Sequence, residues 1–182
     1  MKTIGIIVGS LRKNSYNKHI AEFLVSQFPA EYSVKMIDIS NLPLYNEDLD
    51  TKTPPNEWVR FREEIKNTNS FIFVTPEYNR SIPAVLKNAL DVGSRPPTQG
   101  VWQGKPGAII SASPGAIGGF GANHHLRQTA VFLDMFIMAQ PEAYLGRIAD
   151  AFDSDGHLKG EWTISFLKKF VGEYVTWIKK FE

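Results

Sequence analysis

The sequence predicts a three-layer α/β/α domain built around a parallel sheet. Short runs rich in Ile, Val and Phe recur along the chain, and each is apolar at successive rather than alternate positions. A strand with that pattern is buried on both faces, which is typical of a parallel sheet covered by helices on both sides. The segments between the runs have a helical period. Neither an internal repeat nor a linker divides the 182 residues, so we expect one domain over residues 1–182.

Strands and helices are expected to alternate along the chain. The predicted strands are Ile4–Val8, Val34–Ile39, Phe71–Thr75, Ala108–Ala112 and Ala139–Leu145. The predicted helices are Ser15–Phe28, Asn56–Asn67, Ile82–Val92, Ala122–Asp134 and Glu161–Phe181. Both the first helix and the last carry one apolar stripe at helical spacing, so we expect both to pack on the core.

Two segments that contain prolines are expected to be surface loops rather than linkers. They are Leu42–Pro55 and Ser94–Pro106. Loops of this length near a site can serve as lids or as interface arms.

Composition excludes several classes of function. Hydrophobic residues make up 43% and charged residues 21% of the chain, which is ordinary for a globular protein. The net charge of +1 argues against broad attraction to nucleic acid. The absence of Cys excludes a thiol nucleophile, a disulfide framework and a Cys-based metal site. No apolar run reaches the length of a signal-peptide core or a membrane span, so we expect a cytoplasmic protein without a membrane partner.

The first candidate site follows the first strand, in the string GSLRKNSYN (Gly9–Asn17). A helix N-terminus offers unpaired N–H groups and a partial positive charge, so it can hold a phosphate. Ser10, Ser15 and Asn17 can add hydrogen bonds, and Arg12 can add a charged one. The alternative is an ordinary helix cap formed by Ser15, with the basic residues solvated.

The second candidate site follows the third strand, in the string TPEYNRSIPAVLKNALD. Pro76 should end the strand ladder, while Pro83 fits the first turn of the next helix with Ser81 as its N-cap. The Glu77–Arg80 loop then offers backbone groups to the edge of a flat heterocycle, with Tyr78 beside its plane. The alternative is a polar turn whose Tyr merely packs.

The third candidate site follows the fourth strand, in the string SASPGAIGGFGANHHLRQ. Gly115, Gly118, Gly119 and Gly121 allow close approach of the backbone to a ligand, or a positive φ. The dinucleotide fingerprint G-x-G-x-x-G is not met, because its third glycine position is His124.

All three strings begin where a predicted strand ends. The carboxyl ends of parallel strands lie at one edge of the sheet, and ligands of open α/β folds bind there. We therefore expect the three loops to form one site.

Taken together, the three strings resemble the NADPH-dependent FMN reductase family, in its chromate and quinone reductase branch. They occur in the order and at the spacing of that family, and the resemblance covers most of the chain. It implies a flavodoxin-like fold, a five-stranded parallel sheet in the order 2-1-3-4-5, and one non-covalently bound FMN.

The resemblance also assigns FMN contacts to the three loops. It implies that the phosphate is held by Ser10, Arg12, Ser15 and Asn17, in a loop lined by Leu11, Lys13, Asn14 and Tyr16. It implies that the isoalloxazine ring contacts Pro76, Glu77, Tyr78, Asn79 and Arg80, with Ser113 and Gly115 approaching from the third loop.

The implied activity is an NAD(P)H oxidoreductase with ping-pong kinetics. NAD(P)H would reduce the bound FMN, and a quinone, a free flavin, an azo compound or a metal oxyanion such as chromate would then reoxidise it. The cofactor carries the chemistry, so no side chain is assigned as catalytic. The chain departs from many relatives at Val92, where they carry Trp, and at Arg80, and both positions are expected near the substrate face.

The resemblance further implies a homodimer or homotetramer. The segment His125–Gln128 would lie in the assembly contacts, with Glu142 as the carboxylate partner of Arg127.

Two other classes of function remain as alternatives. One is a flavodoxin-like electron carrier without direct NAD(P)H turnover, which the near-neutral charge disfavours. The other is a non-flavin scaffold that retains the fold, which the phosphate loop disfavours.

Three further features have simpler interpretations than their residues first suggest. His124 and His125 are helical neighbours that point about 100° apart, so we expect no shared metal ion. Asp153–Gly156 has the start of an EF-hand loop but lacks the later ligands, so we expect a turn. Trp102 either caps the flavin of a neighbouring subunit or anchors its own loop.

Overall fold

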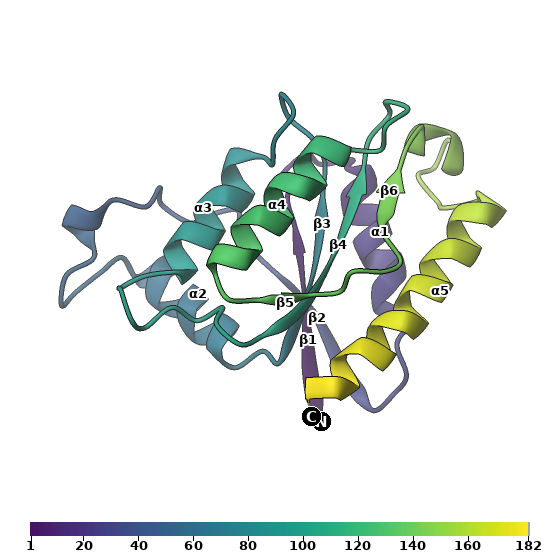
Figure 1. Cartoon of the computed structure of the whole chain (residues 1–182). Coiled ribbons are helices and arrows are strands. Elements are labelled where there is room, and N and C mark those ends of the chain that lie inside the picture. The colour runs from purple at the N-terminus through teal and green to yellow at the C-terminus, as the bar shows by residue number, and fades with distance from the viewer. Residues whose placement is uncertain (182) are drawn as a thin grey trace.

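The computed structural model describes residues 1–181 and contains a parallel sheet in the order β2-β1-β3-β4-β5. Helices cover both faces of this sheet (Figure 1). Its strands are β1 (Lys2–Val8), β2 (Tyr32–Ile37), β3 (Ser70–Thr75), β4 (Pro106–Ala112), β5 (Phe136–Ile137) and β6 (Ala143–Leu145). The predicted three-layer fold and strand order are confirmed.

Two apolar cores lie on opposite faces of the sheet because the central strands are buried on both sides. The helices are α1 (Tyr16–Val25), α2 (Asn56–Lys66), α3 (Ala84–Gly93), α4 (Phe120–Phe132) and α5 (Glu161–Ile178). One core takes side chains from α1 and α5, and the other from α2, α3 and α4. The apolar stripe of α5 packs as predicted, with Leu167, Phe170 and Tyr174 fully buried.

The fifth strand is shorter and more interrupted than predicted. In place of one strand over Ala139–Leu145, β5 pairs with the start of β4 and β6 pairs with its end. Pro141 lies between the two pieces, and a proline has no N–H to donate to a strand ladder. The sheet therefore has six strands in five positions.

Helix boundaries differ from the prediction by up to three residues. Ser15 caps α1, as the alternative interpretation of the first loop held, because its hydroxyl accepts from Lys18 N at 3.4 Å. The predicted cap of α3 is wrong, because Pro83 itself is the N-cap residue. Ser81 instead pairs with Tyr78 in an isolated antiparallel bridge.

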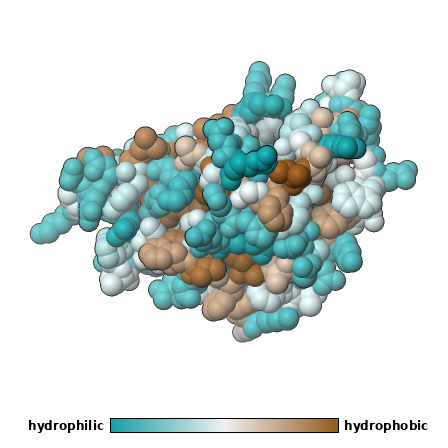
Figure 2. Space-filling model, turned by 45° about the horizontal axis from the view of Figure 1, so that its top comes forward, coloured by the Kyte–Doolittle hydropathy of each residue, from teal (hydrophilic) through white to brown (hydrophobic). Residues whose placement is uncertain are grey.

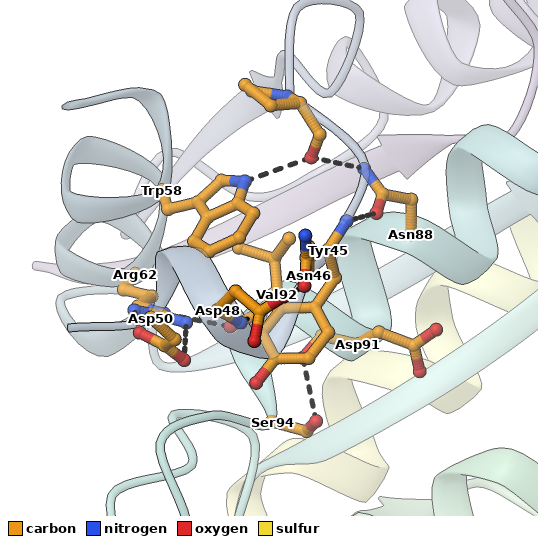
Figure 3. A network of polar contacts seen from close by, with 11 residues as sticks. Tyr45, Asn46, Asp48, Asp50, Trp58, Arg62, Asn88, Asp91, Val92 and Ser94 are labelled. Carbon is orange, nitrogen blue, oxygen red and sulfur yellow. Dashed lines mark hydrogen bonds and ion pairs between the residues drawn. The ribbon is translucent and has the colours of Figure 1, made fainter. Parts of the chain in front are cut away.

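The Leu42–Pro55 loop is a surface excursion, as predicted, but polar contacts fasten its first part to α2 and α3 (Figure 3). Asn88 on α3 accepts from Tyr45 N at 2.8 Å and donates to the carbonyls of Leu42 and Pro43. The Arg62 guanidinium on α2 donates to both carboxylate oxygens of Asp50, at 2.9 and 2.8 Å. This loop is therefore held in place although little of it is regular structure.

The Ser94–Pro106 loop connects the end of α3 to the start of β4, so it lies at the amino edge of the sheet. That edge is opposite to the three candidate site loops (Figure 1). Within this chain the loop is therefore no lid for that site.

Trp102 anchors this loop, which decides between its two interpretations. Its side chain is 1% exposed and packs edge-on against Phe61 and Phe71, at ring-centroid distances of 6.1 and 5.2 Å. Its indole N–H donates to the Leu90 carbonyl at 3.0 Å. A residue this deeply buried has no surface left to cap a neighbouring flavin.

Replacing Trp102 with Ala should therefore lower the free energy of unfolding by about 3–5 kcal/mol, because it leaves a large cavity. Trp102→Phe keeps much of the packing and should cost less. The control is Trp162→Ala, since Trp162 is 68% exposed and its loss should change stability by no more than about 0.5 kcal/mol. Chemical denaturation measures all three, and equal effects of the two Ala substitutions would contradict the anchoring role.

Candidate functional site

The three candidate loops meet at the carboxyl edge of the sheet, as predicted. The strand register places the first residues of the three loops at the same height of the sheet, because Val8 pairs with Val74 and Thr75 pairs with Ser111. Figure 2 is tilted so that this edge comes forward, and it shows hydrophilic side chains interspersed with apolar ones. Among residues 1–181, no helix has both the length and the apolar character needed to cross a bilayer.

The first loop has the geometry of an anion site. The α1 helix begins directly after Ser15 and carries no acidic side chain in its first turn. An anion at this helix end would therefore meet unopposed N–H dipoles. Gly9 lets the loop start close to β3, because a Cβ there would lie 2.9 Å from Thr75 Oγ1.

Four consecutive residues of this loop are exposed, namely Leu11, Arg12, Lys13 and Asn14. Arg12 folds back over the loop, where its guanidinium donates to the Asn14 carbonyl and lies 5.4 Å from the centroid of the Tyr16 ring. Ser10 is half-buried, and its hydroxyl accepts from Arg12 N at 3.4 Å. The guanidinium satisfies a backbone carbonyl here, so it must turn to reach a phosphate.

Asn17 ties the first loop to the end of β4. Its buried Nδ2 donates to the Ala112 carbonyl at 3.2 Å, across 95 residues of sequence. Its Oδ1 is also buried and has no hydrogen-bond partner among the described residues. A buried, unpaired acceptor beside an anion site fits a ligand that also carries hydroxyl donors. The phosphate and ribityl hydroxyls of FMN supply both kinds of group.

The second loop is a tight hairpin rather than an open coil. Tyr78 and Ser81 exchange two backbone hydrogen bonds, of 2.9 and 3.0 Å. Asn79 and Arg80 between them both have positive φ, at 50° and 66°, as a type I′ turn requires. This turn leaves the Tyr78 side chain 52% exposed at the carboxyl edge.

Glu77 connects the second loop to the third. Its Oε2 accepts from Ala122 N in the first turn of α4 at 3.1 Å, where a carboxylate also stabilises the helix dipole. Its Oε1 pairs with Arg80, so both carboxylate oxygens are engaged. Pro76 is half-buried, and its carbonyl accepts from the Thr75 hydroxyl at 2.8 Å. The side chain of Glu77 thus ties the hairpin to the first turn of α4.

The third loop turns back on β6. Gly118 and Gly119 have φ of 61° and 75°, which only glycine adopts freely. The Ser113 hydroxyl accepts from Gly115 N at 3.1 Å. A Cβ at Gly115 would meet only that hydroxyl within 4 Å, so this glycine has open space above it.

Val92 is not near the substrate face, contrary to the expectation from the sequence. It is fully buried in the core between the sheet and α2 to α4. It lies on the second half of α3, which runs away from the carboxyl edge. Arg80, the other departure, is exposed on the second loop.

His124 and His125 have separate partners, in keeping with their predicted divergence. His124 Nε2 lies 2.9 Å from the Tyr144 hydroxyl, and His125 Nδ1 lies 3.0 Å from the Ser81 hydroxyl. Sequence reasoning missed both partners. No local pattern indicates them, because they lie 20 and 44 residues away.

Arg127 and Glu142 both lie near Tyr144. Burial and a hydrogen bond with Glu142 raise the pKa of Tyr144 to about 12, and Arg127 partly offsets this. Arg127 donates to Asn123 Oδ1 at 3.0 Å and to the Met138 carbonyl at 3.1 Å.

The Asp153–Gly156 segment is a turn, as predicted. Asp153 Oδ1 accepts from the backbone N–H groups of Asp155 and His157, at 3.0 and 2.8 Å. Side-chain atoms of these three residues lie within 4.8 Å of one another on an open surface.

The chain belongs to the NADPH-dependent FMN reductase family, whose model matches residues 1–150. This class of enzyme uses FMN with NAD(P)H as its reductant, so both cofactor predictions are confirmed at the level of the family.

Individual relatives are similar to this chain over nearly its whole length. A quinone reductase of Pseudomonas putida is 52% identical over 177 residues, which are 97% of this chain and 95% of that protein. An NAD(P)H-dependent FMN reductase of Pseudomonas aeruginosa is 40% identical over 180 residues, 99% of this chain and 96% of that one. The solved structure of FerB, a flavoenzyme NAD(P)H:(acceptor) oxidoreductase from Paracoccus denitrificans, has a TM-score of 0.90 and 38% identity, covering 99% and 98% of the two chains.

The role of Asn17 can be measured by stability alone. Asn17→Ala removes the donor to the buried Ala112 carbonyl, so it should lower the free energy of unfolding by about 1–3 kcal/mol. Asn14→Ala is the matched control in the same loop, because Asn14 is exposed, and it should change stability by about 0.5 kcal/mol or less. Chemical denaturation without added flavin measures the loss of this hydrogen bond apart from any effect on ligand binding. Equal free energies of unfolding of the two variants would contradict the stabilising role of the contact between Asn17 and Ala112.

Proposed function

We propose that this protein is an FMN-dependent NAD(P)H oxidoreductase that reduces quinones. The observation that carries the proposal is the junction of three loops at the carboxyl edge of the sheet. They combine a helix N-terminus free of acidic residues, a buried unpaired acceptor on Asn17 and an exposed hairpin at Tyr78. The names of two relatives indicate the class of electron acceptor: one is a quinone reductase and the other is a 2-hydroxy-1,4-benzoquinone reductase.

When bound, FMN supplies the hydride chemistry that links NAD(P)H to the acceptor. The chain would hold it within residues 1–182, as one flavodoxin-like domain. Ser10, Arg12, Ser15 and Asn17 would bind the phosphate, with Leu11, Lys13, Asn14 and Tyr16 forming the rest of the loop. Pro76, Glu77, Tyr78, Asn79, Arg80, Ser113 and Gly115 would surround the ring.

The protein itself would orient the bound flavin ring and polarise it. Backbone N–H groups of the second and third loops would stabilise negative charge that develops on the ring. The hairpin and the Glu77 contact with α4 hold these groups in place before the ligand binds, so little ordering is required on binding. No side chain of the chain needs to act as a general acid or base.

Acceptors other than quinones belong to the same proposal. A site open to solvent beside Tyr78 suits free flavins, azo compounds and chromate as further acceptors. We also propose a cytoplasmic location, because the reductant NAD(P)H is made and recycled inside cells.

A homodimer or homotetramer is likewise proposed, with α4 in its contacts. The α4 helix leaves Val131 and Phe132 strongly exposed, and large apolar side chains that are exposed together favour burial against a partner. Arg127 and Glu142 lie on the same side near Tyr144, where they could meet a second copy.

An absorbance experiment tests the activity. The purified protein mixed with FMN should retain a flavin band that bleaches when NADPH or NADH is added without oxygen, and the band should return when a quinone is added. A bound flavin that resists both nucleotides would instead indicate an electron carrier. Failure to retain flavin would overturn the proposal.

The phosphate loop can be tested through Arg12. Arg12→Ala should weaken FMN binding by about 1.5–3 kcal/mol, because a direct charge-assisted hydrogen bond to the phosphate is lost. Arg12→Lys is the charged control and should lose less, although it cannot bind in bidentate fashion. Fluorescence titration of FMN measures each affinity, and an unchanged value in Arg12→Ala would remove Arg12 from the site.

A further inference from the structure

Two apolar side chains are exposed where the third loop enters α4. Ile117 and Phe120 are 52% and 49% exposed. They belong to one turn, because the Phe120 N–H donates to the Ile117 carbonyl at 3.2 Å. Apolar side chains that are exposed together at a binding edge suit a ligand with an apolar face. Neither residue is among those assigned to FMN.

Close packing places this turn against the hairpin of the second loop. A Cβ at Gly119 would lie 3.7 Å from the Cβ of Glu77. A Cβ at Gly121 would lie 2.9 Å from the Arg80 carbonyl oxygen. The residues on both sides of Phe120 thus lie against the hairpin, so Phe120 is next to the proposed ring site.

Two other rings support the ring of Phe120. Its centroid lies 4.1 Å from that of His124 and 5.2 Å from that of Tyr144. His124 Nε2 and the Tyr144 hydroxyl lie 2.9 Å apart, which holds these two supporting rings together. About half of the Phe120 side chain nevertheless stays open to solvent. A ring that is supported in this way can stack on a planar ligand with little further ordering.

This surface has little net charge at neutral pH. Ile117 and Phe120 are apolar, and burial is the main reason that the pKa of Tyr144 is raised to about 12, so its hydroxyl stays neutral. Arg80 of the adjacent hairpin is paired with Glu77 at 3.1 Å. An oxyanion would lose hydration here without gaining an unpaired cation, whereas a neutral planar ring would not.

We propose that Phe120 is a specificity-determining residue for the electron acceptor. Its ring, with Ile117 beside it, forms a wall on which a planar aromatic acceptor such as a quinone stacks. The inference rests on the proposed function and deepens it, because it divides the proposed acceptors into two classes. Quinones, free flavins and azo compounds carry a planar ring that can use the wall, and chromate does not.

The oxidative half-reaction tests the wall apart from NAD(P)H. The FMN-loaded protein is reduced with a stoichiometric amount of dithionite and mixed with 1,4-naphthoquinone, or with ferricyanide, which is an anion without a planar ring. Phe120→Ala should lower the rate constant for naphthoquinone about threefold to tenfold and that for ferricyanide less than about twofold. Each variant is compared with the unsubstituted protein for the same acceptor, so differences in reduction potential between the acceptors cancel.

Two further variants separate the ring from a general loss of apolar surface. Phe120→Leu keeps much of the apolar area without the aromatic ring, so its loss for naphthoquinone should be intermediate. Phe136→Ala is the matched control, because Phe136 is 45% exposed and stacks on Phe181 at 5.0 Å. Phe136 pairs with the start of β4, so it lies at the opposite edge of the sheet. This control should change neither rate constant by more than about twofold.

Direct binding provides a readout without turnover. The probe is 2-naphthol, which is planar and neutral but cannot accept a hydride, and it is titrated calorimetrically into the oxidised, FMN-loaded protein. Phe120→Ala should weaken its binding about threefold to tenfold, because the stacking partner is lost. Phe136→Ala should leave the affinity unchanged.

Three results would overturn the role of Phe120. They are equal losses for naphthoquinone and ferricyanide in Phe120→Ala, unchanged binding of 2-naphthol, and a smaller oligomer in gel filtration of Phe120→Ala than of Phe136→Ala. The last would mean that the ring packs between copies of this chain. An unsubstituted protein that retains no flavin, or whose flavin is not reduced by NAD(P)H, would overturn the proposed function instead.

Discussion

The arrangement of this protein depends on one constraint, which is that its central strands are parallel and buried on both faces. Two parallel strands cannot be joined by a tight turn, so each connection returns across the sheet through a helix. Every loop that follows a strand consequently lies at the same edge. The level register of β1, β3 and β4 then brings three loops from distant parts of the sequence into one site.

Long-range contacts hold these loops in their conformations. Asn17 joins the first loop to β4, and Glu77 joins the second loop to α4. Glycines at 118 and 119 let the third loop turn with positive φ. Because these contacts are formed within the chain itself, they fix the positions of the loops before a ligand arrives, which suits a cofactor whose own atoms perform the chemistry.

The position of β1 next to the sheet's centre divides the carboxyl edge into two regions. The loops after β3 and β4, with the first residue of α4, leave the side chains of Tyr78, Ile117 and Phe120 exposed. The end of β2 places the Asp38 carboxylate opposite basic side chains of the first loop and α1. One loop, Gly9–Asn17, borders both regions.

The sequence by itself determined the fold class, the order of the elements, the three site loops and the family, because apolar periodicity and short motifs are local properties of the chain. Only the tertiary structure decided that Trp102 anchors a loop, that Val92 is buried and that Pro83 rather than Ser81 caps α3. It likewise decided the break at Pro141 and the contact of Glu77 with α4. The physical reason is that a side chain's partner is set by strand register and helix packing, which join residues far apart in sequence, and no local pattern records which residues those will be.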